Sequence, residues 1–247
     1  GVNNSRQSNY GSFSDYVNMN PYWRPYDDTG EPIMGFYAID SNYQTANPLY
    51  DAAQTSFSKS NYTNIRNSTM VDMDIFKNVR INLNLGITTQ HQEDDDFTSP
   101  KSTRYTIEQT SFALNDRGEY IKQYEEMNMF QLGGTVSWAK VYGGHSLYLG
   151  ANAQMMETNT RSTGINVKGF INDEMNDISD ANSYEGTRPS SSEATTRSIG
   201  FTGTFNYNYE SRYFFDASYR ADGSSSFGSQ SRWAPFWSVG AGWDLAN

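Results

Sequence analysis

Few residues in this chain have the types and spacing that catalysis or metal binding requires. The acidic run Asp94–Asp96 could bind calcium, because hard cations take clustered carboxylate oxygens, but a solvated, self-repelling loop is the favoured interpretation. The two histidines, His91 and His145, lie far apart in the sequence, and Ser146 would face away from His145 in a strand. There is no cysteine and no catalytic or phosphate-binding motif. We expect no enzyme activity, no catalytic residue, no metal site and no cofactor.

A second candidate is the charged pair Arg220 and Asp222, which lies directly before Gly223 and three serines. Residues two apart in a strand share a face, so these two side chains can pair. Gly223 would permit a positive φ in the following turn, and the serines can bond the turn backbone. The pattern indicates a hairpin-shaping device in preference to a substrate site.

The element that must position such groups is clearest at Val79–Gln90, which reads V-R-I-N-L-N-L-G-I-T-T-Q. Apolar residues alternate with polar ones throughout this segment, as expected of one strand with an oily and a wet face. Its 12 residues exceed the usual soluble strand of about 5–6. A tilted strand that crosses a bilayer needs about 9–11. Length and alternation together predict a transmembrane β-strand.

The same alternation recurs along the chain and predicts an all-β protein. Seven strands are expected, at Asn64–Ile75, Val79–Gln90, Met127–Lys140, His145–Met156, Thr195–Tyr209, Tyr213–Asp222 and Arg232–Trp243. Short connections at Phe76–Asn78, Val141–Gly144 and Glu210–Arg212 alternate with the longer His91–Glu126, Glu157–Glu193 and Gly223–Ser231. Outer-membrane barrels alternate short periplasmic turns with long extracellular loops in this way. The predicted fold class is an antiparallel transmembrane β-barrel segment.

Composition agrees with this interpretation. The net charge is −10 and the mean hydropathy is −0.74, which a barrel allows because only every second strand residue meets lipid. Nine acidic and four basic residues lie in 91–126, and seven acidic and three basic in 157–193. Without a basic stripe, nucleic-acid binding is not expected. Aromatic rings near strand ends are typical of the girdles at a membrane boundary; these are Tyr142, Tyr207, Tyr209, Tyr213, Trp233 and Trp243.

Residues 1–61 differ from residues 62–247, which carry the predicted strands. The first region holds four of the seven prolines and shows little alternation outside Ile33–Asp40. Its segment N-P-Y-W-R-P-Y predicts a structured, mostly extracellular loop. Tyr, Trp and Arg are common contact anchors, so the candidate partner-contact residues are Tyr22, Trp23, Arg24 and Tyr26. A loop packed on itself is an equal alternative.

The ends of the sequence favour a piece of a larger protein. Gly1–Asn4 has neither the basic nor the apolar region of a signal peptide. Seven strands would leave two open edges, and an open sheet edge is not tolerated in lipid. We therefore expect further strands, and the signal peptide, outside this chain.

The sequence resembles the SusC/RagA-like TonB-linked outer-membrane proteins of Bacteroidetes. The segment Arg220–Gly228 reads R-A-D-G-S-S-S-F-G and matches their R-x-D-G-S-S-x-F-G hairpin, followed by Phe236, Ser238 and Trp243 of their F-x-S…W strand. Weaker matches are Asn20–Tyr22, Asn47–Leu49 and Ile65–Ser68, in the family's order. Trp237 stands where many members have proline.

The resemblance implies a plug domain inside a barrel of roughly 22 strands, with the plug outside this chain. It implies TonB-dependent uptake of oligosaccharides or peptides across the outer membrane, with TonB and a SusD-like surface lipoprotein as partners. Polar residues such as Arg66, Asp72, Asp74, Arg80, Asn82 and Asn84 would line the lumen or contact the plug. Two alternatives stay open: an outer-membrane barrel for surface adhesion or assembly, and a soluble β-sandwich binding module.

Overall fold

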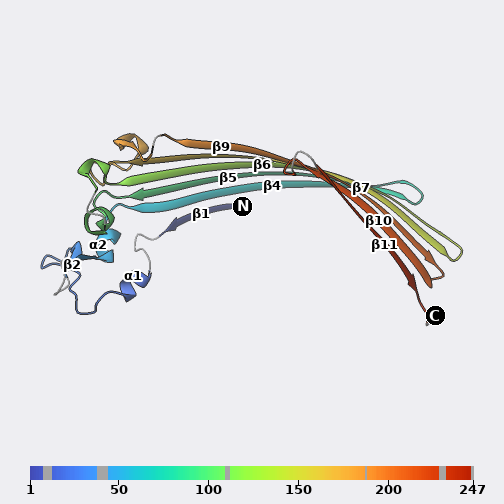
Figure 1. Ribbon diagram of the computed structural model, residues 1–247, viewed down its shortest axis with the longest axis horizontal. Helices are drawn as coiled ribbons and strands as arrows, with labels where there is room; N and C mark the ends of the chain where they lie inside the picture. Colours follow the sequence, from blue (N-terminus) through green and yellow to red (C-terminus); the bar gives the residue numbers. More distant parts are fainter. Residues whose placement is uncertain (8–12, 38–43, 109–111, 187, 228–231, 246–247) are drawn as a thin grey trace. The chain divides into compact units, whose positions relative to one another are not determined.

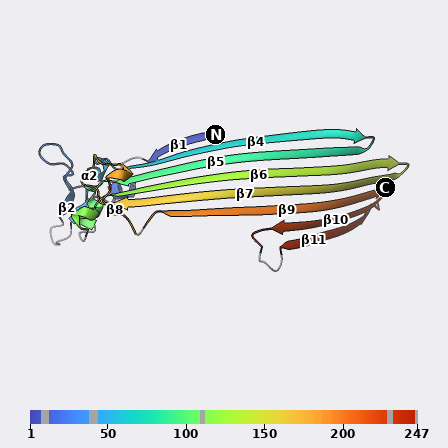
Figure 2. The ribbon, with the colours of Figure 1, turned by 90° about the horizontal axis from the view of Figure 1, so that it is seen from above.

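The computed structural model describes residues 1–7, 13–37, 44–108, 112–186, 188–227 and 232–245. These residues form a nine-stranded antiparallel sheet in the order β1-β4-β5-β6-β7-β9-β10-β11, with β8 paired to β7, and a separate two-stranded sheet of β2 and β3. Successive long strands are neighbours, as Figures 1 and 2 show. The predicted all-β class is confirmed. The described residues form no closed barrel, since β1 and β11 are the edges of the sheet.

The strands are β1 (Val2–Gln7), β2 (Gly35–Tyr37), β3 (Gln44–Ala46), β4 (Phe57–Phe76), β5 (Val79–Thr98), β6 (Glu119–Tyr142), β7 (His145–Lys168), β8 (Ser183–Tyr184), β9 (Ser190–Tyr209), β10 (Tyr213–Ser224) and β11 (Trp233–Trp243). Helical elements are short: α1 (Phe13–Val17), α2 (Pro48–Ala52), the π-helical turn η1 (Arg104–Glu108), and the 3₁₀ turns η2 (Leu114–Asp116) and η3 (Ile178–Asp180). In the described part of the chain, no helix is long and apolar enough to cross a membrane.

All seven predicted strands are present. Asn78 and Gly143 have φ of 82° and 58°, so each of these two tight turns contains one residue in the left-handed conformation. Four further strands, β1, β2, β3 and β8, were not predicted. Three of them have only two or three residues, and β1 is too polar to show alternation.

The predicted long connections are corrected to shorter ones. Strand β5 continues to Thr98 and β6 begins at Glu119, while β7 continues to Lys168 and β9 begins at Ser190. The alternation fails in these extensions because polar side chains occupy both faces, as in H-Q-E-D-D-D at 91–96. Backbone pairing and ion pairs such as Lys122 with Glu93 and Asp95 hold them without an apolar pattern.

The chain divides into two compact units. Unit 1 comprises residues 1–63, 91–126 and 161–192, and unit 2 comprises residues 64–90, 127–160 and 193–247. The divisions fall inside β4, β5, β6 and β7, and inside β9 after its first three residues. Each of these five strands therefore contributes residues to both units.

Unit 1 has a small aromatic core. Phe97, Tyr120, Val167 and Phe170 are buried together, and the Phe97 and Phe170 rings meet edge to face at 5.2 Å. Phe57 from the start of β4 adds a fourth ring, 5.7 Å from that of Phe97. Aromatic pairs of this geometry add roughly 0.5–1.5 kcal/mol to the gain from burial alone.

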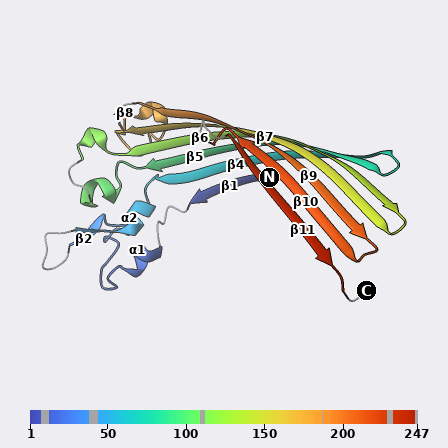
Figure 3. The same ribbon diagram turned by 45° about the vertical axis from the view of Figure 1, so that its right-hand side comes forward.

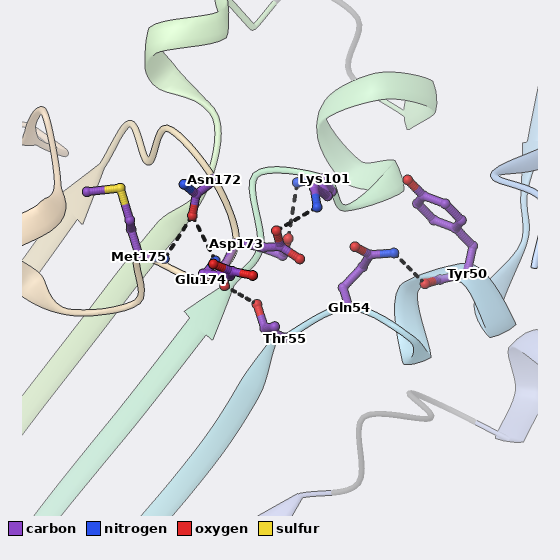
Figure 4. A network of polar contacts seen from close by, with 9 residues as sticks. Tyr50, Gln54, Thr55, Lys101, Asn172, Asp173, Glu174 and Met175 are labelled. Carbon is purple, nitrogen blue, oxygen red and sulfur yellow. Dashed lines mark hydrogen bonds and ion pairs between the residues drawn. The ribbon is translucent and has the colours of Figure 1, made fainter.

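Polar contacts around Asp173 hold three connections of unit 1 together, namely those between α2 and β4, between β5 and β6, and between β7 and β8 (Figure 4). The Lys101 ammonium donates to the Asp173 carboxylate at 2.6 Å, and the Thr55 hydroxyl donates to the Asp173 carbonyl at 2.5 Å. The Lys101 hydrogen bond holds the pKa of Asp173 below its usual range, because it stabilises the ionised carboxylate. Nearby, the Thr103 backbone N–H donates to Asp51 at 2.8 Å. These contacts fix the loops without a large core.

Unit 2 contains no buried hydrophobic side chain among its described residues. Its strands form one layer, and the view in Figure 3 shows β9, β10 and β11 side by side. Apolar residues at alternate positions stay exposed, among them Val71, Leu83, Leu132, Leu149, Phe201 and Val239. The alternation of the sequence is therefore present in the structure, but nothing in the described chain covers its apolar side.

Candidate functional site

Unit 2 has two chemically different faces, fixed by strand register. On the apolar face Tyr219 lies opposite Trp237, and Ala217 opposite Val239. Trp237 is 77% exposed and Val239 60%. On the other side, the polar face, Ser218 lies opposite Ser238 and their hydroxyls bond at 2.7 Å. Side chains of one strand thus separate by period two, as the sequence predicted.

Aromatic rings mark the apolar face at both ends of β10 and β11. Tyr209, Tyr213 and Trp243 stack side by side with ring centroids 6.3 and 6.1 Å apart, next to the 210–212 turn. At the opposite end Phe201 stacks on Trp233 at 6.2 Å. Rings also lie between these rows, such as the Phe205–Phe215 pair, so aromatic side chains of this face are not confined to its two ends.

The polar face carries hydrogen-bonded pairs across neighbouring strands. Arg80 donates to Asp74 at 2.9 Å, and Asn82 donates to Asp72. Asn206 donates to Asp216 at 2.6 Å. Such pairs satisfy polar groups locally and keep the face wet, which is the arrangement expected for residues proposed to line a barrel.

A hollow of about 430 Å³ lies on the polar face of unit 2 and crosses β5, β6, β7, β9 and β10. Its polar lining comes from four amide side chains, one ion pair and two serines: Asn84, Gln131, Asn152, Gln154, Arg220, Asp222, Ser198 and Ser224. Phe227, which follows β10, completes the lining. Sequence reasoning missed this hollow, because its members come from five strands whose pairing register has to be known first.

Two glycines make room for the hollow. A Cβ on Gly133 would lie 2.1 Å from the Asn84 amide oxygen, and a Cβ on Gly200 would lie 2.7 Å from Asp222 Oδ1. Because these positions carry no side chain, the Asn84 side chain can lie over β6 and the Asp222 side chain over β9, close to the backbone of the neighbouring strand. Glycine at polar-face positions of neighbouring strands was the available sequence signal.

The Arg220–Asp222 prediction is confirmed as a pair, with Arg220 Nε donating to Asp222 Oδ2 at 2.6 Å. The role predicted for Gly223 is wrong, since its φ is not positive. A Cβ at Gly223 would lie 3.2 Å from the Trp233 ring on β11, so this glycine accommodates an aromatic ring that covers it. Ser224 Oγ accepts from the Ser226 N–H in the turn, as predicted for the serines.

Ser225 binds the adjacent strand instead of the turn. Its hydroxyl accepts from the Arg197 N–H at 2.9 Å, and its own N–H donates to the Arg197 carbonyl at 2.8 Å. The Arg197 side chain in turn pairs with Glu157 at 2.8 Å. The motif therefore ties β10 to β9 as well as shaping the hairpin. Gly228, its last residue, and part of the predicted Gly223–Ser231 connection lie outside the described residues.

The other chemistry-bearing residues are not brought together. His91 contacts the Tyr124 hydroxyl at 3.4 Å in unit 1, and His145 bonds the Tyr207 hydroxyl at 2.8 Å in unit 2. The run Asp94–Asp96 lies within β5, where alternate carboxylates face opposite sides. Among the residues that the structure describes, no group of three or more His, Cys, Asp or Glu could hold a metal ion.

The candidate partner-contact residues all lie in unit 1. Tyr22 is 91% exposed, and the Arg24 side chain is exposed beside Asp28 at 4.0 Å. Trp23 instead stacks on Phe36 with ring centroids 4.5 Å apart. Tyr26 forms an isolated bridge with Pro32 and stays exposed. Tyr22, Arg24 and Tyr26 therefore have exposed side chains, while Trp23 has a structural contact of its own.

Comparison with solved structures shows that the fold of this chain is similar to part of larger transporter chains. It is similar over 91% of its length to a chain of the RagAB peptide transporter, with a TM-score of 0.70 and 21% identity. Similarity extends over 89% of the chain to the RagAB peptide importer in its "open-open" and "closed-closed" states, with TM-scores of 0.67 and 0.68 and 21% identity in both. The chain spans 23–24% of the length of those chains. No family model and no curated protein matches the sequence.

Proposed function

We propose that this chain is part of the wall of a TonB-dependent outer-membrane transporter of the SusC/RagA kind, which takes up oligosaccharides or peptides. The observation that carries the proposal is the single-layered sheet of unit 2, apolar and uncovered on one face and polar on the other. A contiguous exposed apolar surface of this kind marks a membrane or protein interface, because soluble monomers rarely expose one.

The dimensions of the apolar face fit a bilayer. The rows at Trp233 and Trp243 are separated by ten residues along β11, about 33 Å of strand. A strand tilted by about 40° would then place the rows roughly 25 Å apart across the membrane, which is the height of the apolar band of outer-membrane barrels. Rings at both ends suit the two membrane–water boundaries.

The β-sandwich alternative has less support. A sandwich buries the inner faces of both of its sheets, whereas the described part of unit 2 has no second layer on its apolar face. The adhesion or assembly alternative shares the same membrane wall. A polar face hollowed by glycines, as at Gly133 and Gly200, favours passage or binding of a ligand over a purely supporting wall.

The remaining parts of the proposal concern the whole protein. The likeness to RagAB chains covers 24% of their length, and the plug, the coupling to TonB and the surface lipoprotein partner would depend on regions outside this sequence. The exposed Tyr22 and Arg24 are the proposed contacts to that lipoprotein, since aromatic and Arg anchors concentrate interface energy.

Uptake by living cells tests the proposal. Cells that carry or lack the gene of the full-length protein would receive fluorescently labelled pools of oligosaccharides and of peptides, with and without a protonophore that abolishes TonB energisation. We expect deletion and the protonophore to remove uptake of one pool, and the gene to restore it. Uptake of both pools unchanged by deletion would contradict the transport function and favour adhesion or assembly.

A further inference from the structure

The polar hollow of unit 2 offers several hydrogen-bonding groups that the described chain does not use. The side-chain amides of Asn84 and Gln154 make no hydrogen bond within the described residues. Asp222 binds Arg220 through Oδ2 and leaves Oδ1 as an acceptor, while Arg220 donates through Nε and leaves two terminal amino groups. Donors and acceptors are therefore both present along this wall.

Hydrogen bonds within the chain fix Asn152 and the Arg220–Asp222 pair before any ligand arrives. Asn84 lies over Gly133, and Asp222 Oδ1 and Gln154 Nε2 both lie over Gly200, where a Cβ would be 2.7 and 3.2 Å away. Asn152 is fixed by donating to the Gly134 carbonyl at 3.1 Å and to Thr135 at 2.9 Å. A preorganised site loses less conformational entropy on binding.

The hollow carries no net charge. Arg220 and Asp222 are the charged residues of its lining, and they neutralise each other at 2.6 Å. A ligand selected by this wall would gain nothing from a charge of its own. This feature disfavours a peptide, whose termini and side chains carry charges. A peptide that adds a strand to a sheet also needs a free edge, whereas β9 and β10 each have neighbours on both sides.

We propose that the hollow is a subsite for a neutral, polyhydroxylated ligand, namely a segment of an oligosaccharide. Each sugar hydroxyl both donates and accepts, and so does each side-chain amide, while Asp222 Oδ1 and Arg220 supply a fixed acceptor and donors. Phe227, whose ring is partly exposed, offers an apolar surface to the C–H face of a sugar. The hollow crosses four inter-strand spacings, about 19 Å, which suits an oligomer. This inference depends on the proposed transport function.

Binding to the full-length protein in detergent tests the subsite. The probes are maltohexaose, xylohexaose and mannohexaose, with a neutral Gly-Ser hexapeptide for comparison, each titrated by calorimetry. We expect at least one hexasaccharide to bind, and Gln154→Ala or Asp222→Asn to raise its Kd about tenfold, as loss of a charge-assisted or paired hydrogen bond does. Gly200→Ala should act likewise, because its Cβ displaces Asp222 and Gln154.

The matched control is Asp74→Asn, which removes another carboxylate from the polar face, paired with Arg80 outside the hollow. It should leave the Kd within about twofold, and all variants should keep the resistance to detergent unfolding of the unaltered protein. Binding of no hexasaccharide would overturn the subsite, as would a Kd equal in variants and control, or hexapeptide binding lost in the same variants. Cellular uptake of peptides would persist in that last case, so the transport proposal would survive the loss of this inference.

Discussion

Unit 1 and unit 2 are built largely from the same strands, yet they differ in whether their apolar side chains are buried. Unit 1 buries Phe97, Val167 and Phe170 to 2–3% exposure, whereas the apolar side chains of unit 2 remain uncovered in the described chain. One strand, β5, carries buried Phe97 near its end and exposed Leu83 near its start. The comparison teaches that strand pairing alone does not decide the surroundings of a strand; the side chains of each part do.

The difference follows from how each unit satisfies its polar groups. Unit 1 pairs charges between its loops, as Lys101 does with Asp173 and Lys168 with Glu185 at 3.1 Å. Unit 2 gathers most of its apolar side chains on one face with only a few polar residues among them, such as Asn67 and Thr69. An exposed surface of this kind marks contact with an apolar medium or with another protein.

The largest expected effect lies in the core of unit 1. Phe97→Ala removes a ring that contacts three other aromatic rings, and should lower the free energy of unfolding by about 3–5 kcal/mol. Urea unfolding of the full-length protein would measure it. Phe13, in the same unit but 81% exposed, provides the control. An equal loss of unfolding free energy from Phe13→Ala would show that burial of Phe97 does not stabilise unit 1.

A somewhat smaller effect should separate the two faces of unit 2. Leu83→Arg places a charge on the apolar face and should cost about 2–4 kcal/mol near the bilayer midplane, whereas Asn82→Arg points to the polar face and can pair with Asp72. Folding titrations of the full-length protein into lipid vesicles would compare them. Equal costs for both variants would remove the distinction between the faces.

The exposed anchors of unit 1 should matter for association but not for folding. Tyr22→Ala and Arg24→Ala should each weaken recovery of the proposed surface lipoprotein partner, by about 1–2 kcal/mol for a central anchor. Pull-down from outer membranes measures the recovered lipoprotein. Trp23→Ala is the contrasting variant, because it also removes the stack on Phe36. Recovery unchanged by all three would remove the anchor assignment.

The smallest effect concerns pH. Because Lys101 lowers the pKa of Asp173 below 3.8, the ion pair stabilises unit 1 above the unfolded pKa, and this stability is lost as pH falls through the lower folded value. Proteolysis of the 169–189 connection should therefore increase slightly only under acid conditions below pH 3.8, and Asp173→Asn should reduce that dependence. A rise in cleavage centred near neutral pH would point to a different group.

Much of the fold could be predicted from the sequence, because period-two alternation identifies strands wherever one face is apolar. Alternation did not identify residues 91–98 and 119–126 as strand, because these segments show no apolar pattern. Ion pairs such as Lys122 with Asp95 hold them instead. The Arg220–Asp222 pair was accessible from parity alone. The hollow was not, because Asn84, Gln154 and Asp222 meet only through the pairing of five strands.

The central claim, that the apolar face of unit 2 lies against lipid, is tested most directly at two neighbouring positions of β11. The chain has no cysteine, so Val239→Cys and Ser238→Cys can each carry a single spin label within this segment of the full-length protein reconstituted in vesicles. Collision with lipid-soluble oxygen and with a water-soluble nickel complex would then be measured for both labels. We predict that oxygen dominates at 239 and the nickel complex at 238. Preferential access of the nickel complex at 239, or protection of that label from both reagents, would contradict the claim.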